Sequence, residues 1–212
     1  MTDFHTLQKR IVQGDHFEKC CGTAEFSEDK HSMFLNMTLP KEAWCVKKLD
    51  TKFQSLKHGL RKNDCADAVI WMPTDSGQWV LHIIEMKKTV TRSSNNTSWE
   101  HIKSQFVGAY RICRMVAAAL DIEIEQVVFY TAFVNDNLSD TDDTEDPVIF
   151  LPDREMPDDI AFPQIEWASG KCRLGDSGWS DNYTDKEHIH IGIQLKESDD
   201  GTYTLTCPCH QI

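Results

Sequence analysis

The chain has no long hydrophobic run and no segment typical of secretion. None of its 212 residues belongs to a stretch that approaches about 18 consecutive apolar residues, which excludes the pattern of a membrane-spanning helix. The first 21 residues mix charged and apolar side chains instead of forming an apolar signal core, so we expect a cytoplasmic protein. A cysteine framework is absent too, because two of the eight cysteines are adjacent and the others are scattered, which favours free thiols.

An overall positive charge is also absent. The formal net charge is −12, but residues 136–159 hold eight Asp and two Glu against one Arg, a net charge of −9. By contrast, residues 41–62 carry seven Lys or Arg against two acids, and residues 87–114 carry six against one. The local excess of positive charge in these two segments leaves nucleic acid open as a partner.

The order of apolar patterns predicts one α/β domain over residues 1–212. Residues 40–134 form its expected core, residues 135–160 an acidic excursion and residues 186–209 a C-terminal β-hairpin extension. A capping box at Thr97–Glu100 predicts where the longest helix begins. We expect helices at residues 4–12, 40–60 and 97–120, strands at 66–72, 78–86 and 125–134, and a second hairpin formed by 188–195 and 202–207.

The first hairpin brings acidic and basic side chains together. Asp67 lies at the start of one predicted strand, and Glu85 and Lys87 lie at the end of its partner. In an antiparallel pair the start of one strand lies beside the end of the next, so the two carboxylates come within reach of one cation. Glu85 and Lys87 share a strand face, while Met86 points to the other.

These side chains suit the hydrolysis of phosphodiesters. Carboxylate oxygens are the ligands that Mg²⁺ prefers, and the ion neutralises phosphate charge and lowers the pKa of a bound water. A positioned ammonium group such as that of Lys87 holds the attacking water or stabilises the developing negative charge. The pattern predicts a metal-dependent nuclease with Asp67, Glu85 and Lys87 at its centre.

The order of Asp67, an apolar strand, a turn, a second apolar strand, Glu85-Met86-Lys87 and a long helix resembles the PD-(D/E)XK nuclease superfamily over residues 40–134. The resemblance implies a restriction-endonuclease-like fold, with a mixed central sheet flanked by helices. It also implies Mg²⁺ (or Mn²⁺) held by both carboxylates and the Met86 backbone carbonyl, Lys87 as the catalytic lysine, and a further polar role for Gln105 on the helix.

Several ligand and strand assignments stay open in the sequence. Asp64 is expected either to hydrogen-bond to a metal ligand or to serve as an alternate ligand, and Glu42 is the available acid on the first helix predicted for the core. Two strands are expected before the long helix, where the core usually has three, and the run His31–Met37 is a possible third. Cys207, Cys209 and His210, with His188 and His190, offer a zinc site as an alternative to a solvated strand face.

Basic and aromatic side chains near the site predict contacts with nucleic acid, and we expect DNA in preference to RNA. A natural setting for such an enzyme is an effector subunit of an antiviral defence complex, which implies a protein partner or a homo-oligomer and no membrane. The rival expectation is a catalytically silent subunit that retains the fold as a scaffold for another protein. The expected nucleic-acid contacts are Lys88, Arg92, Trp99, Lys103 and Arg111.

Overall fold

The computed structural model describes residues 17–49, 64–92, 96–139, 163–174 and 186–210, and it shows a mixed α/β protein. Its strands form one sheet in the order β1-β4-β5-β6-β7-β9-β8 and a smaller one in the order β10-β11-β3-β2. No helix within these ranges has the length and apolar character needed to cross a membrane. The elements are β1 (Glu18–Cys20), β2 (Thr23–Glu28), η1 (Asp29–His31), β3 (Met33–Thr38), β4 (Ala43–Lys47), β5 (Ala68–Pro73), β6 (Trp79–Val90), α4 (Trp99–Leu120), β7 (Ile124–Asp136), α5 (Pro163–Ser169), β8 (Lys171–Arg173), β9 (Glu187–Gln194), β10 (Lys196–Glu197) and β11 (Tyr203–Pro208).

The centre of the larger sheet is an antiparallel meander followed by a helical crossover. β4, β5 and β6 pair antiparallel in succession, and β7 then runs parallel to β6 after α4. A parallel neighbour requires a crossover connection, which α4 supplies. The first predicted hairpin, the longest predicted helix and the strand predicted after it are therefore confirmed.

The N-cap of α4 lies one residue later than the capping box predicts. Ser98, not Thr97, is the N-cap, and its Oγ accepts a hydrogen bond from the His101 N–H at 3.2 Å. Asp121 closes the helix in the left-handed conformation with φ of 53°. An apolar stripe along the helix, which includes Ile102 and Phe106, is buried in the core beneath it.

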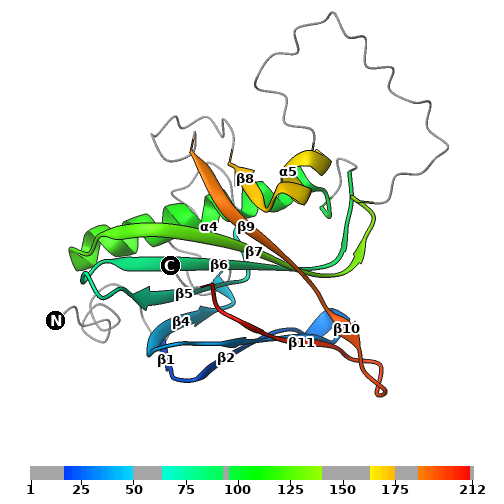
Figure 1. The fold of residues 1–212 in the computed structure, drawn as a ribbon, viewed down its shortest axis with the longest axis horizontal. Helices are drawn as coiled ribbons and strands as arrows, with labels where there is room; N and C mark the ends of the chain where they lie inside the picture. Colours follow the sequence, from blue (N-terminus) through cyan, green and yellow to red (C-terminus); the bar gives the residue numbers. More distant parts are fainter. Residues whose placement is uncertain (1–16, 50–63, 93–95, 140–162, 175–185, 211–212) are drawn as a thin grey trace, which may run out of the picture.

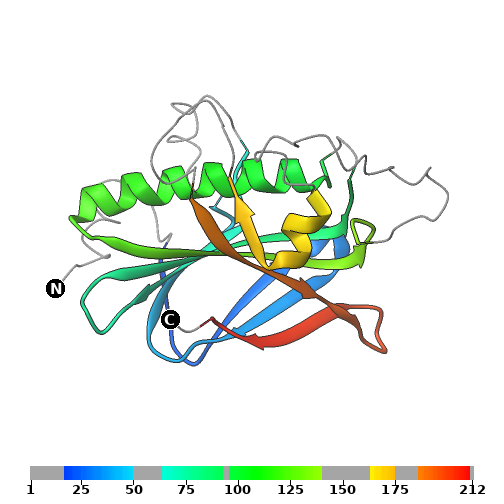
Figure 2. The same ribbon diagram turned by 45° about the horizontal axis from the view of Figure 1, so that its top comes forward.

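Both faces of the larger sheet are covered (Figures 1 and 2). α4 lies across one face, and the smaller sheet lies against the other. Because side chains alternate along β6, Leu81 and Ile83 join the core under α4, whereas Val80 and Ile84 join the core between the sheets. This double burial explains why β6 and β7 read as nearly continuous apolar runs.

The predicted helix of residues 40–60 is wrong at its start. Residues Ala43–Lys47 form β4, and Cys45 and Val46 are buried. Aromatic and β-branched side chains such as those of Trp44 and Val46 suit a pleated surface, and pairing with the apolar β5 outweighs the helical spacing. Residues 50–60 and the predicted helix of residues 4–12 lie outside the described ranges.

β4 also supplies the third strand before the long helix. The run His31–Met37 contributes β3 instead, which belongs to the smaller sheet between β2 and β11. The strand was hidden in the sequence because its five residues carry only a short apolar pattern, which the neighbouring helix-like spacing obscures.

The predicted C-terminal hairpin divides between the two sheets. β9 pairs with β7 and β8 in the larger sheet, whereas β11 lies parallel to β3 in the smaller one. The turn formed by residues 198–202 joins β11 to the short β10, so the hairpin itself involves Lys196 and Glu197. β9 pairs with the apolar β7 and extends the larger sheet. Its side chains are buried more fully there than they would be in an isolated two-stranded hairpin. Most of the acidic excursion lies outside the described residues.

Candidate active site

The end of the β5–β6 ladder places Asp67 opposite Glu85. Ala68 pairs with Ile84, and the same register carried one residue further sets the two acids against each other. The backbone N–H of Met86 donates to Asp67 Oδ2 at 2.8 Å, which fixes the Asp67 carboxylate at the strand end. The hairpin thus brings these two side chains together as the sequence predicts.

Glu85 is a fully buried carboxylate beside an ammonium group. Its side chain is 1% exposed, and Lys87 Nζ lies 2.5 Å from Glu85 Oε1. Neither carboxylate oxygen has a partner of full hydrogen-bond geometry among the described residues, so the Lys87 contact is an ion pair of close approach. Burial and then the nearby Asp67 charge raise the pKa of Glu85 to about 8, although Lys87 and the Asp67 backbone N–H oppose this shift.

Lys87 shares the face of Glu85 and reaches the surface of the molecule. Its side chain is 17% exposed, so the ammonium lies between the buried acid and solvent. The acid and its counter-charge are two residues apart on one strand, and this spacing puts both side chains on the face that α4 covers. The arrangement concentrates one positive and two negative groups where the pairing of β5 with β6 ends.

The helix α4 closes over this strand end through a tight backbone contact. The Ala66 N–H donates to the Gln105 carbonyl oxygen at 3.1 Å. At Gly108 an added Cβ would lie 1.8 Å from the Asp64 carbonyl oxygen, so this close approach requires glycine. Gln105 Oε1 is buried and has no hydrogen-bond partner among the described residues. This side-chain oxygen is thus an unsatisfied acceptor on the helix that bonds to the Asp67 segment.

Asp64 lies beside the same helix, where two residues that the sequence reasoning missed accompany it. Asp64 Oδ2 accepts from Ser104 Oγ at 3.2 Å and lies 3.9 Å from His101 Nδ1. Partial burial lowers the pKa of His101, the Asp64 carboxylate opposes this and the Lys87 ammonium reinforces it. His101 and Ser104 precede Gln105 by four and one positions, and the four-residue spacing from His101 is the signal that could have identified it.

Glu42 does not belong to this group of residues. It precedes β4, at the opposite end of that strand from Lys47, which pairs with Ala68. Its carboxylate forms a half-exposed ion pair with Lys19 at 2.7 Å. The prediction of Glu42 as an alternate ligand is wrong because β4 is a strand, so the helical geometry behind that prediction does not exist.

Two of the five predicted nucleic-acid contacts are structural instead. Trp99 is 1% exposed, and its indole N–H donates to Glu166 Oε2 at 2.7 Å, so its ring cannot stack on a base. The Lys103 ammonium lies 3.0 Å from the same Glu166 oxygen and 2.9 Å from Glu100. Both side chains contact Glu166 because α5 packs on the start of α4. Lys88 and Arg92 are exposed, and Arg111 is partly exposed.

The predicted zinc ligands lie on different layers. His188 and His190 face the α4 side, where their rings contact Phe129 and Trp99. Cys207 and Cys209 pack between the two sheets. Within the described residues, no three His, Cys, Asp or Glu side chains converge as a metal-binding group. The separation follows from the division of the C-terminal strands between the sheets.

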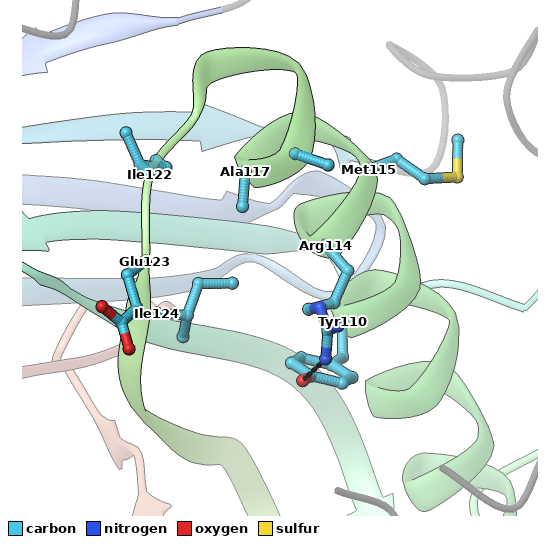
Figure 3. Close-up of a pocket in the computed structure, with 8 residues that line it drawn as sticks. Tyr110, Arg114, Met115, Ala117, Ile122, Glu123 and Ile124 are labelled. Carbon is cyan, nitrogen blue, oxygen red and sulfur yellow. Dashed lines mark hydrogen bonds between the residues drawn. The ribbon is translucent and has the colours of Figure 1, made fainter.

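One cavity adjoins the site and another lies far from it. Asp67 and Met86 line a cavity of about 230 Å³ together with Lys47 and Lys48. Figure 3 shows a second cavity of about 510 Å³ at the end of α4, where Arg114 Nη1 donates to the Tyr110 hydroxyl at 2.9 Å. The wall of this cavity adjoins the start of β6, about 20 Å from Glu85 at the rise of a β-strand. The remote cavity therefore plays no part in the chemistry at Glu85.

Comparison with the models of known protein families, with curated proteins and with solved structures yields no match to this chain. The assignment of a function therefore rests on the geometry of its own residues.

Proposed function

We propose that the protein is a Mg²⁺-dependent nuclease that hydrolyses phosphodiester bonds, with DNA as the preferred substrate. One observation carries this proposal: the wholly buried Glu85 carboxylate lies opposite Asp67 and 2.5 Å from the Lys87 ammonium. A lone buried carboxylate is costly, and cations offset that cost. Two acids and an ammonium at one strand end suit phosphate chemistry better than they suit packing.

The residues present fit a divalent metal ion. Asp67, Glu85 and the Met86 carbonyl are hard oxygen donors, and both Glu85 oxygens lack full hydrogen-bond partners among the described residues. These three groups would hold Mg²⁺ or Mn²⁺. When bound, the ion supplies neutralisation of the phosphate charge and a lowered pKa for water.

The remaining residues orient the attacking water and stabilise the negative charge that develops on the phosphate. The Lys87 ammonium is positioned to hold the attacking water by hydrogen bonding and to stabilise negative charge that develops on the phosphate oxygens. Gln105 Oε1, an acceptor without a hydrogen-bond partner among the described residues, is available to accept a hydrogen bond from that water. The Met86 N–H keeps the Asp67 carboxylate turned toward the strand end.

The order of elements around the site supports a restriction-endonuclease-like core. β4, β5 and β6 provide three antiparallel strands, α4 follows, and β7 lies parallel to β6. Asp67 directly precedes the second of these strands, and Glu85 lies within the third, where its pairing with β5 ends. We extend the proposal to a cytoplasmic effector subunit of a defence complex, with a protein partner or a second copy.

A metal-dependent cleavage assay tests the nuclease. Single- and double-stranded DNA and RNA are incubated with the full chain and Mg²⁺, Mn²⁺ or a chelator. Glu85→Ala and Lys87→Ala should each lower cleavage by at least about 10²-fold, as the loss of an electrostatic group in a catalytic site does. Ile84→Val, which alters the opposite face of β6, should keep wild-type cleavage. Wild-type rates in either alanine variant would refute the assignment.

A second proposal is a catalytically silent scaffold, and the ion pair itself favours it. The Lys87 ammonium already compensates Glu85, and Glu85 lines none of the cavities described above. A scaffold should show no cleavage with either metal, should not change its unfolding temperature on addition of Mg²⁺, and should co-purify with another protein. A Mg²⁺-dependent rise in unfolding temperature that Glu85→Ala removes would exclude it.

A further inference from the structure

Three buried polar side chains lie in a row on neighbouring strands, on the face of the larger sheet that α4 covers. Glu85 of β6 pairs in register with Thr131 of β7, and both residues are 0% exposed. Thr131 Oγ1 lies 3.0 Å from Nε2 of His190 on β9, which is 2% exposed. We name Glu85, Thr131 and His190 the polar row.

The polar row lies in aromatic surroundings. The His190 ring centroid is 4.6 Å from that of Trp99 and 5.0 Å from that of Trp167. Phe129, two residues before Thr131, packs on Phe106 of α4 with ring centroids 4.7 Å apart. A hydroxyl and an imidazole cost free energy in such surroundings unless their protons meet acceptors. The number of protons in the polar row therefore constrains its hydrogen bonds.

One ring nitrogen of His190 lies beside an acceptor for the imidazole proton. Burial lowers the pKa of His190 to about 3, so its ring is neutral near neutral pH and carries a single N–H. Nδ1 is buried without a hydrogen-bond partner among the described residues, and a buried N–H without an acceptor is rare. The proton therefore belongs on Nε2, which donates to Thr131 Oγ1. The Thr131 hydroxyl then keeps its own proton for another acceptor.

A carboxyl oxygen of Glu85 is the adjacent acceptor, because it offers lone pairs whether or not the group carries a proton. Glu85 lies beside Thr131 in the ladder, and its carboxylate lacks full hydrogen-bond partners within the described chain. The terminal torsion of a glutamate is soft, so a rotation turns one oxygen toward the hydroxyl. We propose that Thr131 and His190 are positioning residues for Glu85: His190 donates to Thr131, and Thr131 donates to the Glu85 carboxylate, leaving its other oxygen for a cation.

This inference rests on the proposed function, because the orientation of Glu85 matters to a metal ligand. Groups that hydrogen-bond to metal ligands fix their direction, and losing such a group typically weakens metal binding about 10- to 100-fold. The polar row would give the site a support that Asp67, Glu85 and Lys87 alone do not provide. Its members come from three strands, so the motif around Glu85 could not reveal it.

The first test needs no metal. Nitrogen-15 NMR of the full chain labelled at histidine distinguishes the two neutral tautomers of His190. The expected result is a proton on Nε2, with a nuclear Overhauser contact to a slowly exchanging Thr131 hydroxyl. In Glu85→Leu that hydroxyl should exchange with water faster, because its acceptor is gone. A proton on Nδ1, or unchanged exchange in the variant, would overturn the inference.

The second test measures the affinity for Mg²⁺ by calorimetry. Thr131→Val should raise the Kd about 10-fold or more, and Thr131→Ser should remain within about threefold of wild type. Tyr130→Phe removes a buried hydroxyl from the opposite face of β7 and serves as the matched control. Should Thr131→Val fail to fold, His190→Leu against His190→Gln asks the same question, since the glutamine amide retains a donor.

The two tests separate the inference from the proposed function. Wild-type affinity in a folded Thr131→Val, together with cleavage that needs Glu85, would overturn the positioning role and leave the nuclease intact. No Mg²⁺ binding by the wild type, with the Nε2 proton and the Thr131 hydroxyl contact observed, would overturn the nuclease. It would also overturn the positioning of a metal ligand, and the hydrogen-bonded row would remain as a structural feature.

Discussion

The two faces of the larger sheet each bury a histidine, yet their surroundings differ. Between the sheets, His82 Nδ1 lies 3.0 Å from the Tyr130 hydroxyl, among aliphatic and methionine side chains. Under α4, His190 lies 3.0 Å from the Thr131 hydroxyl, and Thr131 pairs with Glu85. Both imidazoles have a pKa lowered to about 3 by burial. A buried histidine is thus common to both faces, but the acid and the ammonium are confined to one.

The difference shows how one strand separates packing from chemistry. Along β6, the residues between Val80 and Met86 alternate between the two faces, so a single register assigns Glu85 to the α4 side. The intersheet side ends in Met86, an apolar side chain without a charge. A one-residue slip of β6 would exchange the two sets and abolish the site.

The pH dependence of stability provides the largest expected contrast between the faces. The pKa of Glu85 rises from 4.5 to about 8 on folding, so its folded state holds the proton more tightly and stability falls as pH rises through this range. His82 shows the opposite sign, since its pKa falls from 6.5 to about 3 and stability is lost as pH decreases through that range. Each effect is at most on the order of 5 kcal/mol, since a pKa change of one corresponds to about 1.4 kcal/mol.

Urea unfolding from pH 4 to pH 9 measures both contrasts. Glu85→Gln should remove the loss above pH 4.5, and His82→Gln should reduce the loss below pH 6.5. Mg²⁺ should stabilise the wild type at pH 8 and have no effect on Glu85→Gln, because the ion replaces the proton on the carboxylate. Parallel pH profiles for Glu85→Gln and wild type would show that the buried acid does not titrate as described.

Substitution at Gly108 should damage the α4 face and spare the other. Gly108→Ala places a methyl group where the Asp64 carbonyl oxygen lies, 1.8 Å from the ideal Cβ, so the backbone must shift. We expect a loss of about 1–3 kcal/mol in the free energy of unfolding. Cleavage should fall as well, because the Asp64–Asp67 segment moves relative to Glu85.

Ala118→Gly on the same helix is the matched control. Its position is exposed, so it should cost about 1 kcal/mol through helix propensity and leave cleavage unchanged. Equal cleavage by Gly108→Ala and wild type would mean that the tight contact with α4 has no part in the site.

The short-range features of the site could be predicted from sequence, and its long-range ones could not. The turn between the β5 and β6 runs sets their register, so the opposition of Asp67 and Glu85 follows from local rules. Thr131 and His190 join the same group only because β7 and β9 pair in parallel, a pairing that no local pattern encodes. β4 was missed for a related reason. The spacing of its apolar residues is mixed, and its five residues form a strand because they pair with the neighbouring β5.

The partners of Trp99 and Lys103 likewise follow from long-range packing. The spacing of α4 shows which side chains share a face, but not that α5 covers its first turn. Trp99 and Lys103 therefore look like surface residues in the sequence and bind Glu166 in the structure. A contact between segments separated by more than 60 residues decides their role.

The smallest expected effect distinguishes an exposed lysine from a paired one. Lys88 is exposed next to Lys87, so Lys88→Ala should weaken DNA binding by a few-fold for every sequence and reduce the slope of log K against log salt by about 1. Lys103→Met should leave that slope unchanged, because its ammonium is held by Glu166 and Glu100, and should cost about 1 kcal/mol of stability. Fluorescence anisotropy between 50 and 200 mM salt, roughly the range over which phosphate contacts are lost, compares the two. A reduced slope for Lys103→Met would place the DNA along the first turn of α4, against the buried geometry of that lysine.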